Sequence, residues 1–330
     1  MRRTLKMCAA LMFCALLVVS AGCRPAPSQP VEKSARLEAV ALPQGGKLLV
    51  IATTSIVGDL VRTVGGERIQ LSLLLPLGTD PHSFDPTPRD VAALSEAHVL
   101  FANGAGLEEF VAMMIANARG KAGVIYVSEG VHLLESHGEQ HAGETKGEGK
   151  EYHHSGADPH TWTSPANAII FVQNIERALS TLDPAGASMY RANAESYTKR
   201  LQALDDWVRE QISRIPPENR KLVTDHEAFG YYAERYGLEQ VGFVFPGTST
   251  LAEPSAADLA KLADTIRQQK IKAVFVGTTV NPNLAKRVAE DTGAKLVPLY
   301  TGSLGGSGSG VETYLDYVRY NTDAIVAALR

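Results

Sequence analysis

Short apolar segments alternate with amphipathic segments in two series along this chain of 330 residues. The first series predicts strands at 48–52, 69–75, 98–102 and 124–127, with helices at 56–64, 88–97 and 107–118. The second series predicts strands at 221–224, 240–244, 273–276 and 295–299, with helices at 228–236, 255–269, 282–292 and 311–329. Strands that alternate with helices favour parallel sheets covered by helices. The sequence therefore predicts an α/β fold with two parallel-sheet lobes, at 47–183 and 216–330.

One long helix is predicted between the two lobes, at 184–215. Asp183-Pro184 has the residue types of a helix N-cap and first position, and Pro216-Pro217 ends the segment. Apolar residues recur between them at helical spacing: Tyr190, Tyr197, Leu201, Leu204, Val208, Ile212 and Ile215. Such a helix is about 45 Å long, which exceeds one small domain. We therefore expect it to join the lobes and to restrain their relative motion.

The first 22 residues have the features of a secretory signal peptide. Basic residues precede an apolar run at 7–19 that is short for a membrane span but typical of a signal. Small residues and Cys23 follow, which is the pattern of a bacterial lipoprotein signal. Ser20 stands where an aliphatic residue is usual, so an ordinary secretory signal is the alternative. We expect Cys23 to carry lipid and the protein to work outside the cytoplasm, as a cell-membrane lipoprotein or in the periplasm.

Residues 23–46 are rich in Pro, Ser, Gln and Gly and are predicted to form a flexible tether behind the lipid. The three cysteines of the chain, Cys8, Cys14 and Cys23, all lie in the signal segment or at its end. The mature chain therefore has no thiol pair for a structural disulfide or for a Cys-ligated metal.

The composition is that of a soluble globular protein, with 45% hydrophobic and 21% charged residues. It excludes a disordered chain, a collagen and a polytopic membrane protein. The formal net charge is -4, so no basic field is available to hold nucleic acid. We expect a monomer that contacts the membrane through its lipid anchor and has no nucleic-acid partner.

Three histidines stand in similar settings and are the candidate metal ligands. His82 and His160 lie in the pattern Asp-Pro-His-x-aromatic, and His226 also follows an Asp and precedes an aromatic residue. Loops of this kind gather at the carboxyl edge of parallel sheets, where ligands bind. Three imidazoles suit Zn²⁺, whereas Mg²⁺ and Ca²⁺ prefer oxygen ligands. The alternative is that each histidine only caps a helix or makes a structural hydrogen bond.

An aspartate precedes each of these histidines: Asp80, Asp158 and Asp225. Such carboxylates can accept the N–H of a metal-binding imidazole. The alternative is that they are helix N-caps, which is a common use of Asp. The sequence leaves the choice open.

The segment 132–157 is predicted to be a surface loop with a second metal-related role. It interleaves histidines with Glu and Gly and cannot build a core. Its residue types favour weak, dynamic capture of Zn²⁺ by His137, His141, His153 and His154. The alternative is a solvated linker with incidental histidines.

Several motifs together resemble one protein family. They are GTDPHSFDPTPRD (78–90), ADPHTWTSPANA (157–168), TDHEAFGYYAERYGL (224–238), AEPSAADLAKL (252–262) and TYLDYVRYN (313–321). Their order and content resemble the zinc- and manganese-specific solute-binding proteins of bacterial ABC importers, in the cluster with a rigid helical backbone. The similarity extends from Lys47 to Arg330.

This resemblance implies two α/β lobes joined by one long helix, with a metal ion in the interlobe cleft. It assigns the ligands to His82, His160 and His226, and it implies a membrane permease as partner. An acidic, histidine-rich loop before the second ligand is typical of the zinc branch. In the manganese branch the third ligand is often acidic, which His226 is not.

One residue departs from the family pattern. Many members have an acidic fourth ligand in the loop after the last strand, where this chain has Gly302. Water, Glu227 or Glu253 could take the fourth position. The loss of a hard oxygen donor favours zinc over manganese.

The sequence therefore predicts capture of Zn²⁺ outside the cytoplasm and its delivery to an ABC permease, without catalysis. A manganese or iron receptor of the same family is the first alternative. A secreted zinc hydrolase is the alternative of another class, because three histidines with an open position can also activate water. Glu227 would then be the general base, but no HExxH motif is present.

Overall fold

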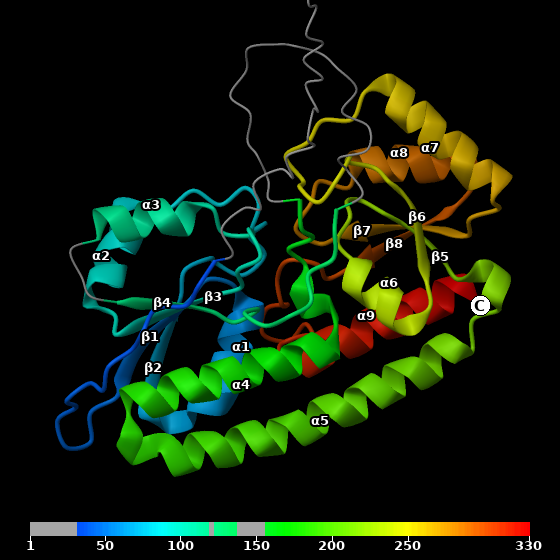
Figure 1. The fold of residues 1–330 in the computed structure, drawn as a ribbon. Coiled ribbons are helices and arrows are strands. Elements are labelled where there is room, and N and C mark those ends of the chain that lie inside the picture. Colours follow the sequence, from blue (N-terminus) through cyan, green and yellow to red (C-terminus); the bar gives the residue numbers. More distant parts are fainter. Residues whose placement is uncertain (1–31, 119–121, 137–155) are drawn as a thin grey trace, which may run out of the picture. The chain divides into compact units, whose positions relative to one another are not determined.

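Two four-stranded parallel sheets organise residues 32–118, 122–136 and 156–330, the part of the chain that the computed structural model describes (Figure 1). The predicted signal peptide, Cys23 and the four histidines of the proposed auxiliary site lie outside these residues. The first sheet has the order β2-β1-β3-β4, and the second has the equivalent order β6-β5-β7-β8. The predicted fold class, two parallel-sheet α/β lobes, is confirmed.

The strands are short and are built from β-branched and other apolar residues. Those of the first sheet are β1 Leu48–Ala52, β2 Ile69–Leu73, β3 Val99–Ala102 and β4 Gly123–Tyr126. Those of the second sheet are β5 Lys221–Thr224, β6 Glu239–Phe243, β7 Ala273–Gly277 and β8 Lys295–Leu299. The central strands β3 and β7 are buried along their whole length, as expected for parallel strands covered on both faces.

Helices cover both sheets. The first lobe has α1 Ser55–Gly65, α2 Pro88–Glu96, α3 Phe110–Asn117 and α4 Pro165–Leu182. The second lobe has α6 Gly230–Tyr236, α7 Ala256–Gln268, α8 Asn283–Thr292 and α9 Tyr314–Leu329. Capping boxes start α2 at Thr87 and α7 at Ser255, where a side-chain oxygen bonds an N–H group of the first turn. Helix α4 was not predicted, because the continuous apolar run at 168–172 has no clear helical period.

Helix α5, Ala187–Ser213, is the long helix between the lobes. A short 3₁₀ turn at Pro184–Gly186 precedes it. It contacts α1 and α4 of the first lobe and α6 and α9 of the second, and Figure 1 shows it running alongside both. At 1.5 Å per residue its length is about 40 Å. The exact lobe boundaries, 47–183 and 216–330, stay predictions.

Hydrogen bonds and an ion pair hold α5 to each lobe. In the first lobe, Arg68 donates to both oxygens of Asp183 at 2.6 and 2.9 Å, and Tyr190 of α5 donates to the same carboxylate. The hydrogen bonds from Arg68 lower the pKa of Asp183. In the second lobe, Asp205 of α5 accepts bonds from Arg235 and from Tyr236 of α6. A single rod is therefore bonded to both lobes.

The hydrophobic core is continuous through the junction of the lobes. One cluster includes residues of both sheets and of α5, among them Val50, Phe171, Tyr190, Tyr232 and Phe275. Each sheet has a second, smaller cluster on its other face. The shared cluster means that the lobes pack on one another and on α5.

The second half of the predicted tether belongs to the folded body. Ala35 donates its N–H to the carbonyl of Val124, and Val40 donates to Leu182. Leu37, Val40 and Leu42 pack against the shared core. The predicted flexible tether, which ended at residue 46, was therefore too long. Leu37, Val40 and Leu42 pack on the core of the folded body, and the local sequence pattern does not show this contact. Within the described residues, no helix is long and apolar enough to cross a membrane.

Candidate metal centre

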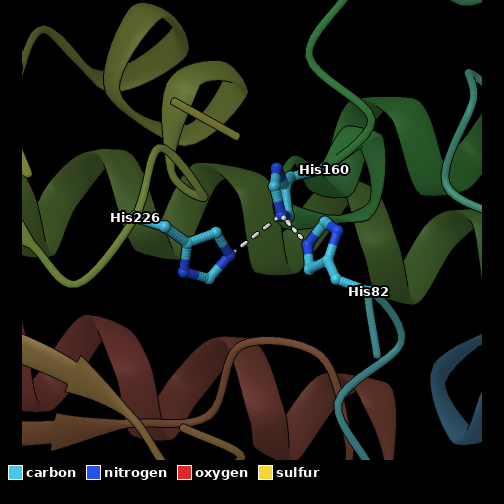
Figure 2. Close-up of side chains that lie close together, drawn as sticks. All are labelled: His82, His160 and His226. Carbon is cyan, nitrogen blue, oxygen red and sulfur yellow. Dashed lines mark hydrogen bonds between the residues drawn. The ribbon is translucent and has the colours of Figure 1, made fainter. Parts of the chain in front are cut away.

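The three candidate histidines come together at the junction of the lobes. His82 lies in the loop between β2 and α2, His160 directly before the 3₁₀ turn Thr161–Thr163, and His226 directly after β5. Figure 2 shows the imidazoles converging on one point. The Nε2 atom of His160 lies 3.1 Å from the Nε2 atom of His82 and 3.1 Å from that of His226. Within the described residues, this is the one group of His, Cys, Asp or Glu side chains close enough to share a metal ion.

The site is almost closed to solvent. His160 is 1% exposed and His226 is 2% exposed, while His82 is partly exposed. The ring centroids are 4.9–5.4 Å apart. Of the three imidazoles, that of His82 is the one in contact with solvent.

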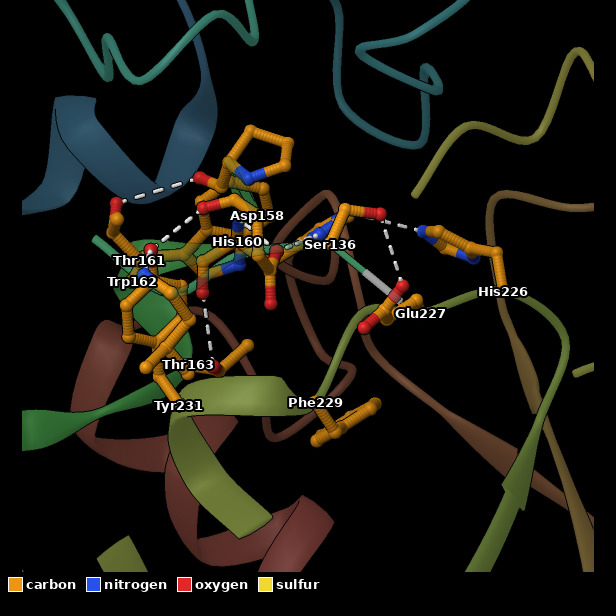
Figure 3. Close-up of polar contacts among 12 residues, drawn as sticks. Ser136, Asp158, His160, Thr161, Trp162, Thr163, His226, Glu227, Phe229 and Tyr231 are labelled. Carbon is orange, nitrogen blue, oxygen red and sulfur yellow. Dashed lines mark hydrogen bonds and ion pairs between the residues drawn. The ribbon is translucent and has the colours of Figure 1, made fainter. Parts of the chain in front are cut away.

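Two aspartates orient two of the imidazoles. Asp158 accepts a hydrogen bond from Nδ1 of His160 at 2.8 Å, and Asp225 accepts one from Nδ1 of His226 at 2.8 Å. Figure 3 shows the first of these pairs beside His226. Because Nδ1 donates its proton to the carboxylate, the neutral ring has a lone pair on Nε2, which points into the site. Asp158 and Asp225 therefore accept ring N–H groups of two of the candidate histidines, and the role of these rings as metal ligands stays a prediction.

Asp80 has a different role. Its carboxylate accepts the backbone N–H of His82 at 3.1 Å and the hydroxyl of Thr250 at 2.5 Å. Thr250 belongs to the second lobe, so Asp80 bonds the His82 loop across the junction. Sequence could not foresee this contact, because a threonine 170 residues away gives no local signal.

The pKa values of the two buried histidines are shifted in opposite directions. Burial, and then the neighbouring His226, hold the pKa of His160 well below its usual value. Burial also opposes protonation of His226, but the charge and hydrogen bond of Asp225 outweigh it and raise the pKa of His226. A protonated His226 can donate from Nε2 to the neutral Nε2 of His160.

The spacing of the nitrogen atoms is compatible with a tetrahedral metal ion. Two Nε2 lone pairs that face each other at 3.1 Å repel unless a cation lies between them. A tetrahedral ion with Zn–N bonds of about 2.0–2.1 Å separates its ligand nitrogens by about 3.3 Å. The separations of His160 from His82 and from His226, 3.1 Å each, are close to that value.

Among residues 32–118, 122–136 and 156–330, no fourth side chain joins this group. Glu227 is buried and accepts a hydrogen bond from Ser136 at 3.2 Å, and Glu253 is exposed. Neither carboxylate belongs to the three-histidine group. A side chain at Gly302 would meet the ring of Pro81, because a Cβ there would lie 2.5 Å from Pro81 Cδ. Water as the fourth ligand stays a prediction.

Further contacts between the lobes surround the site and were not found from sequence. Ser136 bonds Glu227, next to His226 (Figure 3). Trp162, two residues after His160, donates its indole N–H to the carbonyl of Thr301 at 3.0 Å. For Glu227 and Trp162 the sequence signal is a position within two residues of a candidate histidine, and Ser136 has no such signal.

The base of the histidine-rich loop lies beside the centre. Ser136 and Asp158 donate backbone N–H groups to Gly156 and Leu134, which closes a short antiparallel pairing on either side of 137–155. Tyr231 of the second lobe donates to the carbonyl of Asp158 at 2.7 Å. The loop therefore re-enters the fold close to His160.

Comparison with known proteins identifies the family. Residues 50–328 match the family model "Zinc-uptake complex component A periplasmic". The chain belongs to this family. It is 31% identical over 325 residues to the manganese-binding lipoprotein MntA of Halalkalibacterium halodurans, covering 98% of this chain and 99% of that protein. It is 32% identical over 292 residues to the manganese ABC transporter substrate-binding lipoprotein PsaA of Streptococcus mitis, covering 86% and 90%.

A solved structure supports the same assignment. The periplasmic zinc binding protein TroA from Treponema pallidum superposes with a TM-score of 0.75 at 29% identity, covering 86% of this chain and 99% of that one. The chain is thus an extracytoplasmic, metal-binding substrate-binding protein of an ABC importer. Such proteins work with a membrane permease, and the family is one of transport proteins rather than enzymes.

Proposed function

We propose that this protein captures Zn²⁺ through His82, His160 and His226 and delivers it to the permease of an ABC importer. The observation that carries the proposal is the group of three Nε2 atoms, two of them set as lone-pair donors by Asp158 and Asp225. Neutral imidazoles suit Zn²⁺, whereas Mn²⁺ sites favour more oxygen ligands. No carboxylate of the described residues belongs to the group.

Manganese is the second candidate, and the names of relatives favour it. MntA and PsaA are named for manganese, while TroA and the family model are named for zinc. The two ions differ in what they need as a fourth ligand. A Mn²⁺ receptor would require an oxygen donor, such as Glu227, to move toward the histidines.

The deciding experiment is metal analysis of the purified protein, followed by competition calorimetry with Zn²⁺ and Mn²⁺. We expect one tightly held Zn²⁺ that Mn²⁺ does not displace. Each of the variants His82→Ala, His160→Ala and His226→Ala should weaken binding by about tenfold or more. His98→Ala is the matched control, because His98 accepts the backbone N–H of Leu49 at the far end of β1. Parent-like binding by all three ligand variants would exclude this site, and preference for Mn²⁺ would exclude zinc.

The remaining parts of the proposal concern capture and attachment. We propose that lipid on Cys23 holds the protein at the membrane as a monomer, and that His137, His141, His153 and His154 collect metal for the centre. Mass spectrometry of the mature N-terminus tests the lipid. A mature chain that starts at another residue, or that carries no added mass on Cys23, would exclude it. A hydrolase remains the weakest alternative, and chelator-sensitive turnover of an ester or peptide would be its signature.

A further inference from the structure

A buried turn of the first lobe contacts the loop that carries His160. The turn, Asn103–Glu108, follows β3, and its backbone has positive φ angles at three successive residues: 82° at Gly104, 56° at Ala105 and 81° at Gly106. Positive φ at Ala105 is strained for a residue with a Cβ atom. Other groups must therefore hold the turn in this shape.

Glu108 holds it. This side chain is 3% exposed, and its carboxylate accepts the backbone N–H groups of Asn103 and Gly104 at 2.7 and 2.9 Å. It also accepts the hydroxyl of Thr53 at 2.6 Å, which links the turn to the end of β1. These bonds use the backbone of Asn103 and leave its carboxamide for another contact.

The Asn103 carboxamide bonds residues on both sides of His160, the carbonyl of Pro159 and the hydroxyl of Thr161. It is fully buried, and its Nδ2 donates to the carbonyl of Pro159 at 2.9 Å and to that of Gly104 at 2.8 Å. Its Oδ1 accepts the hydroxyl of Thr161 at 3.2 Å. A side chain that bonds residues 159 and 161 fixes the direction in which residue 160 points.

We propose that Asn103 is a positioning residue for metal binding, which acts by holding the His160 loop in its ligating geometry. The inference rests on the proposed three-histidine site. Asn103 touches neither the imidazole nor the metal. A shift of the His160 loop would change the metal centre, because Nε2 of His160 lies 3.1 Å from each of the other two Nε2 atoms. A ligand that is not pre-oriented must be ordered when metal binds, which lowers affinity.

Asn103→Ala is the test, and Asn174→Ala is the matched control. Asn174 is also buried in the first lobe, and its Nδ2 donates to two backbone carbonyls, those of Val127 and Glu129, both at 2.8 Å. Neither carbonyl belongs to a ligand loop. Both variants should lower the thermal midpoint, but only Asn103→Ala should weaken Zn²⁺ binding, by about tenfold.

The electronic spectrum of bound Co²⁺ gives a readout that a purely structural role would not change. We expect altered d–d bands in Asn103→Ala and parent-like bands in Asn174→Ala. Should Asn103→Ala fail to fold, Thr161→Val removes one bond of the same network, and Thr161→Ser restores it. Weaker binding in the Val variant and parent-like binding in the Ser variant would then support the proposal.

The outcomes separate this inference from the proposed function. If His160→Ala abolishes Zn²⁺ binding while Asn103→Ala keeps the parent affinity and Co²⁺ spectrum, the positioning role is refuted and the site stands. Equal losses in Asn103→Ala and Asn174→Ala also refute it. If the parent binds no Zn²⁺, or if His160→Ala binds it with the parent affinity, both proposals are refuted.

Discussion

Replacement of Asp225 by Asn tests how the protein prepares His226 for metal. Asp225 is 1% exposed, and three donors share its two oxygens. Oδ1 accepts N–H of His226 at 2.7 Å and Nδ1 at 2.8 Å, and Oδ2 accepts N–H of Gly277 at 2.6 Å. An amide has only one accepting oxygen, so the side chain introduced by Asp225→Asn cannot satisfy both sides.

The magnitude follows from the two ways in which the amide can lie. With its oxygen toward Gly277, its NH₂ group faces Nδ1 of His226, which must then accept, and the ring proton moves to Nε2, while the backbone N–H of His226 loses its acceptor. Metal binding requires the other orientation, which leaves NH₂ against the buried N–H of Gly277. Each orientation thus leaves one buried N–H unsatisfied, at a cost of about 1–3 kcal/mol of stability. Because the orientation that metal requires also replaces a charged acceptor of Nδ1 by a neutral one, the affinity of Asp225→Asn should fall by about 10- to 100-fold.

Competition calorimetry against a chelator of known Zn²⁺ affinity measures this loss. Asp205→Asn is the control, because Asp205 is also a buried, hydrogen-bonded carboxylate but bonds Arg235 and Tyr236 away from the three histidines. It should lower stability and leave affinity unchanged. The tautomer argument is refuted if folded Asp225→Asn binds Zn²⁺ with the parent affinity, or if Asp205→Asn weakens binding equally.

Three further predictions concern the packing of Gly302 on Pro81, the Arg68–Asp183 ion pair and the histidine-rich loop. Gly302→Ala should displace Pro81 and with it the His82 loop, because the new Cβ would lie 2.5 Å from the proline ring. Calorimetry should then show weaker Zn²⁺ binding, and binding with the parent affinity would contradict this packing. The Arg68–Asp183 ion pair stabilises the fold above the unfolded pKa of Asp183, and this stabilisation is lost as the pH falls through the lowered folded pKa of Asp183. Asp183→Asn should therefore make the thermal midpoint decline less steeply below about pH 4. An unchanged decline would exclude the ion pair as its cause. Deletion of 138–154, which keeps the bonded base of the loop, should slow metal capture in stopped-flow more than it changes equilibrium affinity, and a large affinity loss would assign these residues to the centre itself.

Local pattern was sufficient for most of the secondary structure. Each predicted strand forms within two residues of its expected bounds, because short apolar runs between turn residues have few other ways to be buried. Helix α5 was predictable for the same reason, since its apolar residues recur at one period along its whole length. Helix α4 and the packing of Leu37 and Val40 were not, because both depend on what the rest of the chain offers as a partner surface.

The candidate site shows the same division. The residue types around His82, His160 and His226 were sufficient to nominate them, because Asp-Pro-His and Asp-His place a carboxylate within reach of each ligand. Only the tertiary structure distinguished the carboxylates, since Asp158 and Asp225 bond a ligand ring while Asp80 bonds Thr250 of the other lobe.

The sequence by itself determined the strands, most of the helices and the fold class, and it nominated the three histidines, because these follow from periodicity and from residue chemistry within short windows. The tertiary structure alone decided that Nε2 of His160 lies 3.1 Å from each of the other two Nε2 atoms, that Gly302 packs on Pro81 and that Asn103 bonds the His160 loop. Such contacts join residues that are far apart in the chain, and their geometry is set by the packing of both lobes on α5 rather than by any local preference.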